Sequence, residues 1–227
     1  MYIIIIKMSE KARAFPQLLP IQKNRDKERE DILTNVIKML TNRGLLKRSD
    51  LNENISKITE SIRETDEYKI TLDYPERYYE NENKTFIVKI INQKIAGVSK
   101  TSIIGEFLYE NKNSPKIVVV NSITSKALNQ IETEFKNTEV FLERELMIDL
   151  VSHVAVPKHE LLTDKDAEQV LQEYETKKRE MPKIFITDPV AKYFNAKLGQ
   201  IFRIIRSSET SGQSAYYRLV IKGTIAS

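Results

Sequence analysis

The run from Asp188 to Val220 is the stretch that most constrains how this 227-residue chain folds. Asp188 is a typical helix N-cap residue, and Pro189 takes the first helical position, where a missing backbone N–H costs nothing. We expect Gly199 to end this short helix, because glycine adopts a left-handed conformation without a steric penalty. The apolar residues that recur at helical spacing between these ends are Val190, Ala191 and Phe194.

Two β-strands are predicted after this helix. The segments Ile201–Ile205 and Ala215–Ile221 are rich in β-branched and aromatic residues, which favour strands. The polar cluster between them, Ser207–Gly212, has the composition of a hairpin turn. The run therefore predicts a unit of helix, turn, strand, hairpin and strand, which is an α+β arrangement.

The same run resembles the C-terminal signature of the subunit shared by the nuclear RNA polymerases I, II and III, a family that also has an archaeal counterpart. The residues that carry the resemblance are Asp188-Pro189-Val190-Ala191, Tyr193, Lys197, Gly199, Ile204-Ile205-Arg206, Ser208-Glu209-Thr210-Ser211-Gly212 and Tyr217-Arg218. Three further segments resemble other parts of the family, namely Arg43-Gly44, Val156-Pro157-Lys158-His159 and Met181-Pro182-Lys183-Ile184. The chain departs from the family pattern at Asn195, where glycine is usual, and at Leu198, where a basic residue is usual.

This resemblance implies a non-catalytic polymerase subunit without a cofactor. The C-terminal domain would assemble onto the largest polymerase subunit, beside the small omega-like subunit, and the chain would not be a homo-oligomer. The N-terminal domain would be a jaw, related in fold to restriction endonucleases, that helps to position downstream double-stranded DNA. The expected location is the nucleus for a cellular protein, and the virion or a cytoplasmic viral factory for a viral one.

The docking surface is expected on the C-terminal domain. Tyrosine and arginine are the side chains that most often anchor protein interfaces, so the main candidates are Arg203, Arg206, Tyr217 and Arg218. The other residues that the resemblance assigns to docking are His159, Asp188, Pro189, Tyr193, Lys197 and Glu209.

Length and composition are those of a two-domain globular chain, with 41% hydrophobic and 30% charged residues. We expect an N-terminal extension over residues 1–21, an α/β jaw domain over 22–149, and an α+β assembly domain with a mixed sheet over 150–227. There are 0 cysteines, which excludes disulfides and thiolate metal sites. No apolar run approaches the roughly 20 residues that span a bilayer, so no membrane segment is expected.

The N-terminal half alternates strand and helix patterns, which predicts an α/β layer around a central sheet. The expected strands are Thr85–Ile91, Lys116–Val120 and the first part of Glu139–Leu150, whose remainder is a linker. The expected helices are Arg25–Arg43, ended by Gly44, then a shorter one from Ser49-Asp50, then Ser99–Tyr109 and Thr124–Phe135. In the C-terminal half, Leu161–Met181 contains a helix capped by Thr163 or Asp164, with Lys177-Lys178-Arg179 in its last turn. Residues 73–84 are expected to form a loop, and Tyr2–Ile6 an edge strand or sequence upstream of a start at Met8.

A site facing DNA is predicted at the start of the helix that begins near residue 124. Backbone N–H groups, hydroxyls and a lysine at a helix N-terminus donate to phosphate oxygens without reading bases. The segment resembles a family loop that faces downstream DNA, and its candidate residues are Ser122, Thr124, Ser125 and Lys126. A plain helix N-cap explains the same residues equally well. The net charge of +4 is mild, so we expect any DNA contact to be weak or assisted.

Other functions have weaker support. A free-standing factor that binds double-stranded DNA is the alternative to a polymerase subunit. A metal-dependent nuclease would need carboxylates on adjacent strands, and the two Glu-x-Lys triplets, Glu82-Asn83-Lys84 and Glu134-Phe135-Lys136, are expected in a loop and at a helix end. His153 and His159 make a poor metal site without other ligands, and Ser207–Gly212 is better explained as a hairpin turn than as a phosphate loop.

Overall fold

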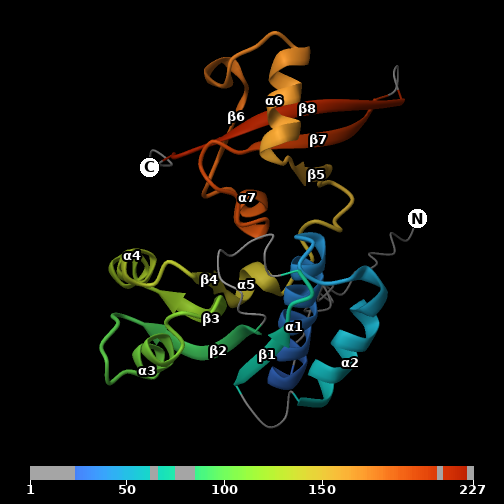
Figure 1. Cartoon of the computed structure of the whole chain (residues 1–227). Coiled ribbons are helices and arrows are strands. Elements are labelled where there is room, and N and C mark those ends of the chain that lie inside the picture. Colours follow the sequence, from blue (N-terminus) through green and yellow to red (C-terminus); the bar gives the residue numbers. More distant parts are fainter. Residues whose placement is uncertain (1–23, 62–65, 75–84, 209–211, 224–227) are drawn as a thin grey trace, which may run out of the picture.

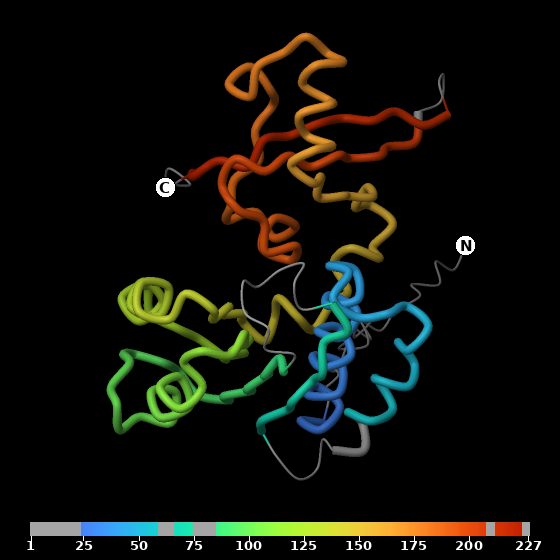
Figure 2. The backbone as a smooth tube through the Cα atoms, viewed as in Figure 1, coloured from blue at the N-terminus to red at the C-terminus, as the bar shows by residue number. Residues whose placement is uncertain are grey.

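The chain folds around two separate four-stranded sheets, as the computed structural model shows in Figure 1. The structure describes residues 24–61, 66–74, 85–208 and 212–223. We call residues 24–146, which hold the first sheet, the N-terminal unit, and residues 158–223, which hold the second, the C-terminal unit. Residues 147–157 connect them, and Figure 2 shows this connection as the tube between the lower and upper parts of the molecule. The domain boundary near residue 149 stays a prediction.

The N-terminal unit is an α/β layer with helices on both faces of its sheet. Its strands lie in the order β1-β2-β3-β4, with β1 antiparallel to β2 and the other pairs parallel. The strands are β1 (Glu67–Thr71), β2 (Thr85–Ile95), β3 (Lys116–Ile123) and β4 (Thr138–Leu142). The helices are α1 (Arg25–Asn42), α2 (Leu51–Ser61), α3 (Ile103–Glu110), α4 (Ser125–Glu134) and α5 (Glu143–Leu146), with a 3-10 helix at Arg48–Asp50.

Alternation along the central strands explains this layering. In β3, Ile117 and Val119 pack into the core that contains α1, whereas Val118 and Val120 pack against α3 and α4. All four side chains are fully buried, because successive residues of a strand point to opposite faces and both faces are covered. The continuous apolar run therefore predicted the strand correctly.

The C-terminal unit is a mixed sheet covered by α6 (Asp164–Glu173) on one face and α7 (Pro189–Tyr193) on the other. The strand order is β5-β7-β8-β6, with only β6 and β8 parallel. The strands are β5 (Lys158–Leu161), β6 (Lys183–Phe185), β7 (Ile201–Ser208) and β8 (Gly212–Ile221). The predicted mixed sheet, the hairpin and the short helix that starts at Pro189 are confirmed.

Two elements of the N-terminal unit were not predicted. The edge strand β1 alternates polar and apolar residues, and its Tyr68 and Ile70 are buried, so period-two alternation was the signal that would have revealed it. The short helix α5 lies in the segment predicted as a linker. The carboxylate of Glu145 accepts a hydrogen bond from the backbone N–H of Leu142 at 2.8 Å and so starts this turn.

Two predicted helix ends were wrong. The helix α7 ends at Tyr193 and not at Gly199, because Asn195 takes the left-handed position with φ 47°. The helix α6 ends at Glu173, with Glu175 left-handed at φ 48°. Lys177, Lys178 and Arg179 therefore lie outside its last turn, and the latter two belong to a 3-10 helix, Lys178–Glu180.

Three of the helices that the structure describes end in the same hydrogen-bonded arrangement. After α7, the N–H of Ala196 donates to the carbonyl of Ala191 and that of Asn195 to Lys192. These are the two bonds of a Schellman motif, which requires a left-handed residue. The same pair of bonds ends α6, where Glu175 is the left-handed residue, and α1, where Gly44 is the left-handed residue. The end of the first helix at Gly44 is thus confirmed.

The predictions for residues 1–21, for Glu82 and for Glu209 lie outside the described residues, as does most of the predicted loop over residues 73–84. None of the helices that the structure describes is both long enough and apolar enough to cross a membrane.

Candidate interaction surfaces

The junction between the two units centres on one buried arginine, Arg43, at the end of α1. Its side chain is 0% exposed. Both terminal nitrogens donate to the carboxylate of Glu139 on β4, at 2.8 and 2.7 Å, in a bidentate pair. The Nε donates to the carbonyl of Tyr193 at 2.7 Å, and one terminal nitrogen also donates to the carbonyl of Lys192 at 3.3 Å. Arg43 therefore ties α1 and β4 of the N-terminal unit to the end of α7 in the C-terminal unit.

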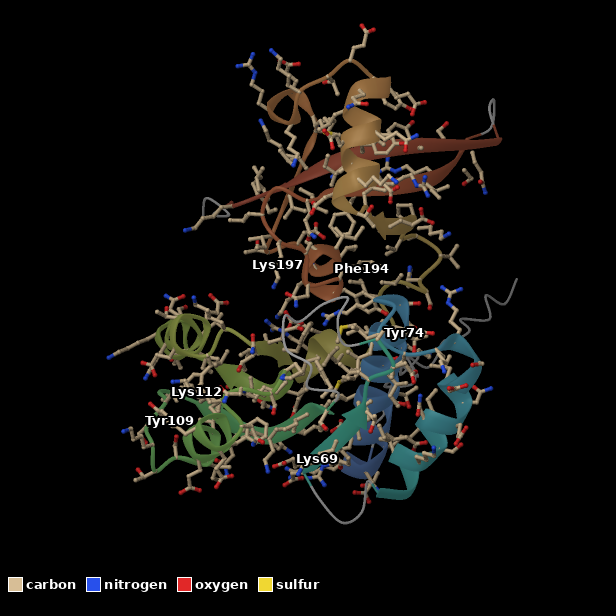
Figure 3. The ribbon with its side chains drawn as sticks, viewed as in Figure 1. Lys69, Tyr74, Tyr109, Lys112, Phe194 and Lys197 are labelled. Carbon is tan, nitrogen blue, oxygen red and sulfur yellow. The ribbon has the colours of Figure 1, made fainter. Side chains whose placement is uncertain are left out.

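Asn195 extends this junction. Its left-handed backbone ends α7, and its side-chain amide donates to the Glu139 carboxylate at 3.1 Å. Its side-chain oxygen accepts from Lys197 at 2.7 Å. Figure 3 shows Phe194 and Lys197 beside α7, at the level where the two units meet. Asparagine is the residue other than glycine that best tolerates this conformation, so the departure from the family's glycine keeps the turn and adds a polar contact.

Further contacts from other elements close the same junction. Asn42 donates to the hydroxyl of Tyr193 at 2.9 Å, and burial raises the pKa of this tyrosine to about 12. Lys192 on α7 bonds Glu145 on α5 at 2.7 Å and lies over the ring of Phe141 at 4.6 Å. The two units are thus joined by charged and polar groups whose partners lie across the boundary, and one apolar core also contains residues of both.

The predicted DNA-facing residues lie together where β3 ends and α4 begins. The hydroxyl of Thr124 accepts from the N–H of Ala127 at 3.3 Å and donates to the carbonyl of Ala96 at 2.9 Å, so it caps α4 and joins it to the end of β2. Ser125 and Lys126 are exposed, and Ser122 is partly exposed.

The sheet adds Lys94 to this cluster. It pairs in register with Ser122 on the neighbouring strand and is exposed. Lys94 was not predicted from the sequence, because β2 continues beyond the apolar residues that identified this strand and includes the polar residues 92–94. The parallel pairing that brings Lys94 to this edge is a tertiary feature.

The predicted docking residues fall on both faces of the C-terminal sheet. On the α6 face, Arg203 bonds Glu160 at 2.8 Å through Nε, and the bonds from Lys158 and Arg203 lower the pKa of Glu160. Tyr217 lies on the same face, with its ring 5.5 Å from that of Tyr174. Arg203 is therefore already paired within the chain, and Tyr217 is half-buried.

Arg206, Arg218 and His159 lie on the opposite face of the sheet, the one that packs against α7. The guanidinium of Arg206 lies over the ring of Tyr216 at 5.3 Å. His159 is bonded through Nδ1 to the carbonyl of Pro157 at 2.7 Å, its ring meets Phe202 edge-on at 5.9 Å, and burial lowers its pKa. It borders a groove of about 900 Å³ between the units.

The remaining docking candidates have local structural roles. Asp188 caps α7 by accepting from the N–H of Val190 at 2.9 Å, and Pro189 is the first residue of that helix, as predicted. Tyr193 is buried inside the chain, with 6% of its surface exposed. The structure therefore gives Tyr193 an internal partner, and the docking assignments themselves stay predictions.

The residues weighed for catalysis and metal binding are dispersed. Glu134 is the last residue of α4 and accepts from Gln130, so this triplet lies at a helix end as expected. His153 accepts from the N–H of Ala155 through Nδ1. Within the described ranges, no three histidine, aspartate or glutamate side chains gather closely enough to hold a metal ion.

Comparisons with known proteins match both halves of the chain. Residues 148–220 match the family model described as RNA polymerase Rpb5, C-terminal domain. The chain is 33% identical over 210 residues to "DNA-directed RNA polymerase subunit 5" of Acanthamoeba polyphaga mimivirus, covering 90% of this chain and 97% of that protein. It is 34% identical over 128 residues to "DNA-directed RNA polymerases I, II, and III subunit RPABC1" of Caenorhabditis briggsae, covering 55% and 61%. It is 52% identical over 69 residues to "DNA-directed RNA polymerase subunit Rpo5" of Methanothrix thermoacetophila, covering 30% and 88%.

Proposed function

The chain belongs to the Rpb5 family of DNA-directed RNA polymerase subunits, and we propose from this premise that it serves as a non-catalytic subunit of a multisubunit polymerase. The observation that carries the proposal is the match to a polymerase subunit 5 over 90% of this chain, which includes both units of the fold. In this proposal, other chains of the complex catalyse RNA synthesis. The protein acts in the nucleus if its source is cellular, and in the virion or viral factory if its source is a virus.

The C-terminal unit is proposed to assemble onto the largest polymerase subunit, beside an omega-like small subunit. The face with Arg206 and Arg218 supports this role, since neither side chain has a carboxylate within 4.0 Å among the described residues. Arginine is a frequent anchor of protein interfaces. The Arg43 junction is proposed to make the subunit rigid, because it holds the N-terminal unit in a fixed orientation relative to the C-terminal unit.

The N-terminal unit is proposed as a jaw, related in fold to restriction endonucleases, that lies against downstream double-stranded DNA. Lys94, Lys126 and the exposed hydroxyl of Ser125 support this role, because they present donors at the start of α4, whose first turn contains no acidic residue. Such groups bind phosphates without reading sequence, and a few contacts of this kind let DNA slide.

Purification of a tagged copy tests the main proposal. The chain is expected to co-purify in equal amounts with the two very large chains of a polymerase, as measured by quantitative mass spectrometry. A chain that purifies alone and binds duplex DNA tightly, with a steep salt dependence, would contradict the subunit proposal and favour a free-standing DNA-binding factor.

Crosslinking to downstream DNA tests the jaw within that purified polymerase. The double change Lys94→Glu and Lys126→Glu should reduce crosslinks from this subunit to downstream DNA several-fold and leave the subunit composition unchanged, because reversed charge repels phosphates. Lys112→Glu is the matched control, since Lys112 lies after α3 and before β3, at the opposite end of the parallel strands. Equal crosslinking by the wild type, the double variant and the control would disprove the DNA contact. The subunit proposal would be unaffected.

A further inference from the structure

The outer edge of β8 lacks a strand neighbour over most of its length. The strand β7 pairs with β8 from Gly212 to Leu219, but β6 pairs only with residues Leu219–Ile221 on the other side. Among the residues that the structure describes, no strand lies beside the outer edge of residues 213–218. An open edge of this length is a template for a further strand.

The hydrogen bonds of β8 show which of its backbone groups point to that edge. The N–H of Leu219 donates outward to Pro182 at 2.8 Å, and the carbonyl of Ile221 accepts from Ile186 at 2.9 Å. The N–H of Val220, by contrast, donates to Gln200 at 2.9 Å, on the β7 side. Since the direction alternates along a strand, the N–H and C=O groups of residues 213, 215 and 217 also point outward.

A groove runs beside this open edge. Its volume is about 560 Å³, and the side chains that line it include Val170, Tyr174, Met181, Pro182, Tyr216 and Arg218. Two of its tyrosines are unusually exposed for large side chains, Tyr174 at 56% and Tyr216 at 51%. Their rings offer apolar surface to side chains of a chain that lies along the edge.

The charges at the groove favour an acidic occupant. Arg206 lies over the ring of Tyr216, and Arg218 is two residues further along β8, on the same face. No carboxylate in the described part of the chain pairs with either guanidinium within 4.0 Å, whereas Glu180, the acidic residue of the lining, pairs with Arg179 at 3.3 Å. The two arginines are therefore available to carboxylates of a partner.

We propose that an extended, acidic segment of a partner protein binds here by adding a strand to the outer edge of β8. The segment pairs with the outward backbone groups of Gln213, Ala215 and Tyr217 and continues the short strand β6 along the sheet. Apolar side chains at alternate positions lie against Tyr174 on the α6 face, and the aspartate or glutamate residues between them meet Arg206 and Arg218 on the opposite face. Main-chain pairing supplies affinity in such complexes, and the side-chain contacts supply specificity. This binding mode shares Arg206 and Arg218 with the face proposed for docking, but it does not rest on the proposed function, because it needs only the edge and groove of this chain.

The test uses the full chain and a fluorescent eight-residue peptide that alternates valine with aspartate, with fluorescence anisotropy as the readout. Saturable binding is expected. A peptide with lysine in place of aspartate should bind at least tenfold more weakly, and so should a peptide N-methylated at alternate amides, since it cannot pair with an edge.

Variants of the chain locate the site. Ala215→Pro removes one outward N–H, and proline is tolerated at such a position because the ladder to β7 is kept. It should weaken binding about tenfold with an unchanged circular dichroism spectrum, and Arg206→Glu with Arg218→Glu should do the same. Lys165→Glu is the matched charge control, since this exposed residue lies at the start of α6, whereas the groove is lined from its far end. It should change affinity less than twofold.

Three outcomes would overturn the proposal. The first is the absence of saturable binding to the wild-type chain. The second is equal binding of the N-methylated or the lysine-containing peptide, a result that does not depend on whether Ala215→Pro folds. The third is self-association of the wild-type chain that Ala215→Pro abolishes, which would assign the edge to a second copy of the chain.

Discussion

Arg43 and Arg218 are two arginines in opposite surroundings. Arg43 is buried at the junction of the two units, where a carboxylate and two backbone carbonyls accept from its guanidinium. Arg218 is partly exposed in the groove beside the open edge of β8, with no carboxylate within 4.0 Å in the described residues. A buried charge must be fully paired to be tolerated, whereas one in reach of solvent can meet a partner. Arg43 therefore holds the two units together, whereas Arg218 is available for binding.

Replacing Arg43 should have the largest effect. We expect Arg43→Ala to lower the free energy of unfolding by about 3–5 kcal/mol, because it removes the guanidinium that donates to the Glu139 carboxylate and to the carbonyls of residues 192 and 193. Denaturant unfolding measures the loss. Adding Glu139→Leu to Arg43→Met should recover part of it, since an apolar pair removes the uncompensated charge. A loss under about 1 kcal/mol for Arg43→Ala would show that the junction does not depend on this arginine.

Lys116 is a second buried cation, and its partners among the described residues are backbone carbonyls. Its side chain is 0% exposed, its Nζ donates to the carbonyls of Asn111 and Ser114 at 2.5 and 3.0 Å, and burial lowers its pKa from 10.5 to about 8. Because the unfolded state then binds more protons between pH 8 and 10.5, the free energy of unfolding should rise across this window, by up to about 3 kcal/mol.

The comparison with Lys116→Met isolates this titration from the other groups that titrate at high pH. Unfolding curves of both proteins at several pH values give the difference in the free energy of unfolding. The difference should grow in favour of the wild type as pH rises from 8 to 10.5. A constant difference would show that the lysine keeps its ordinary pKa in the folded chain.

The left-handed residues Glu175 and Asn195, which are not glycines, should show smaller effects, of about 1 kcal/mol. Glu175→Gly should raise the free energy of unfolding by about 0.5–1 kcal/mol, because glycine removes the steric cost of positive φ. Asn195→Gly should instead lower it by about 1 kcal/mol, because the hydrogen bond to Glu139 is lost. Thermal unfolding of both variants checks the opposite signs. Equal stabilisation would mean that the Asn195 side chain adds nothing to the junction.

Changing Arg218 should have the smallest effect on stability. We expect Arg218→Ala to change the free energy of unfolding by less than about 0.5 kcal/mol, since substitutions away from the core and from internal ion pairs contribute little. Denaturant unfolding beside Arg43→Ala makes the comparison direct. A loss of several kcal/mol would place Arg218 in an internal network and remove it from the proposed interface.

The sequence predicted which residues belong to the candidate docking surface, but not the burial or the partners of each one. The resemblance and the frequency of arginine at protein interfaces together pointed to Tyr193, Arg203 and Arg206. Their burial and pairing separate them: Tyr193 is internal, Arg203 is bonded to Glu160, and Arg206 lies over Tyr216. The sequence pattern contains no signal for these differences, since each depends on the residue across the sheet or across the junction.

Local patterns determined the helices, the buried strands and the hairpin, because 3.6-residue and two-residue periodicities, caps and glycines act within a few positions of the chain. The tertiary structure alone decided that Arg43 meets Glu139, 96 positions away, and that Asn195 joins them. It also decided that β6 is too short to cover β8, which leaves the edge open. These contacts depend on how the two sheets are placed in space, and residue types along the chain do not encode that placement in any short window.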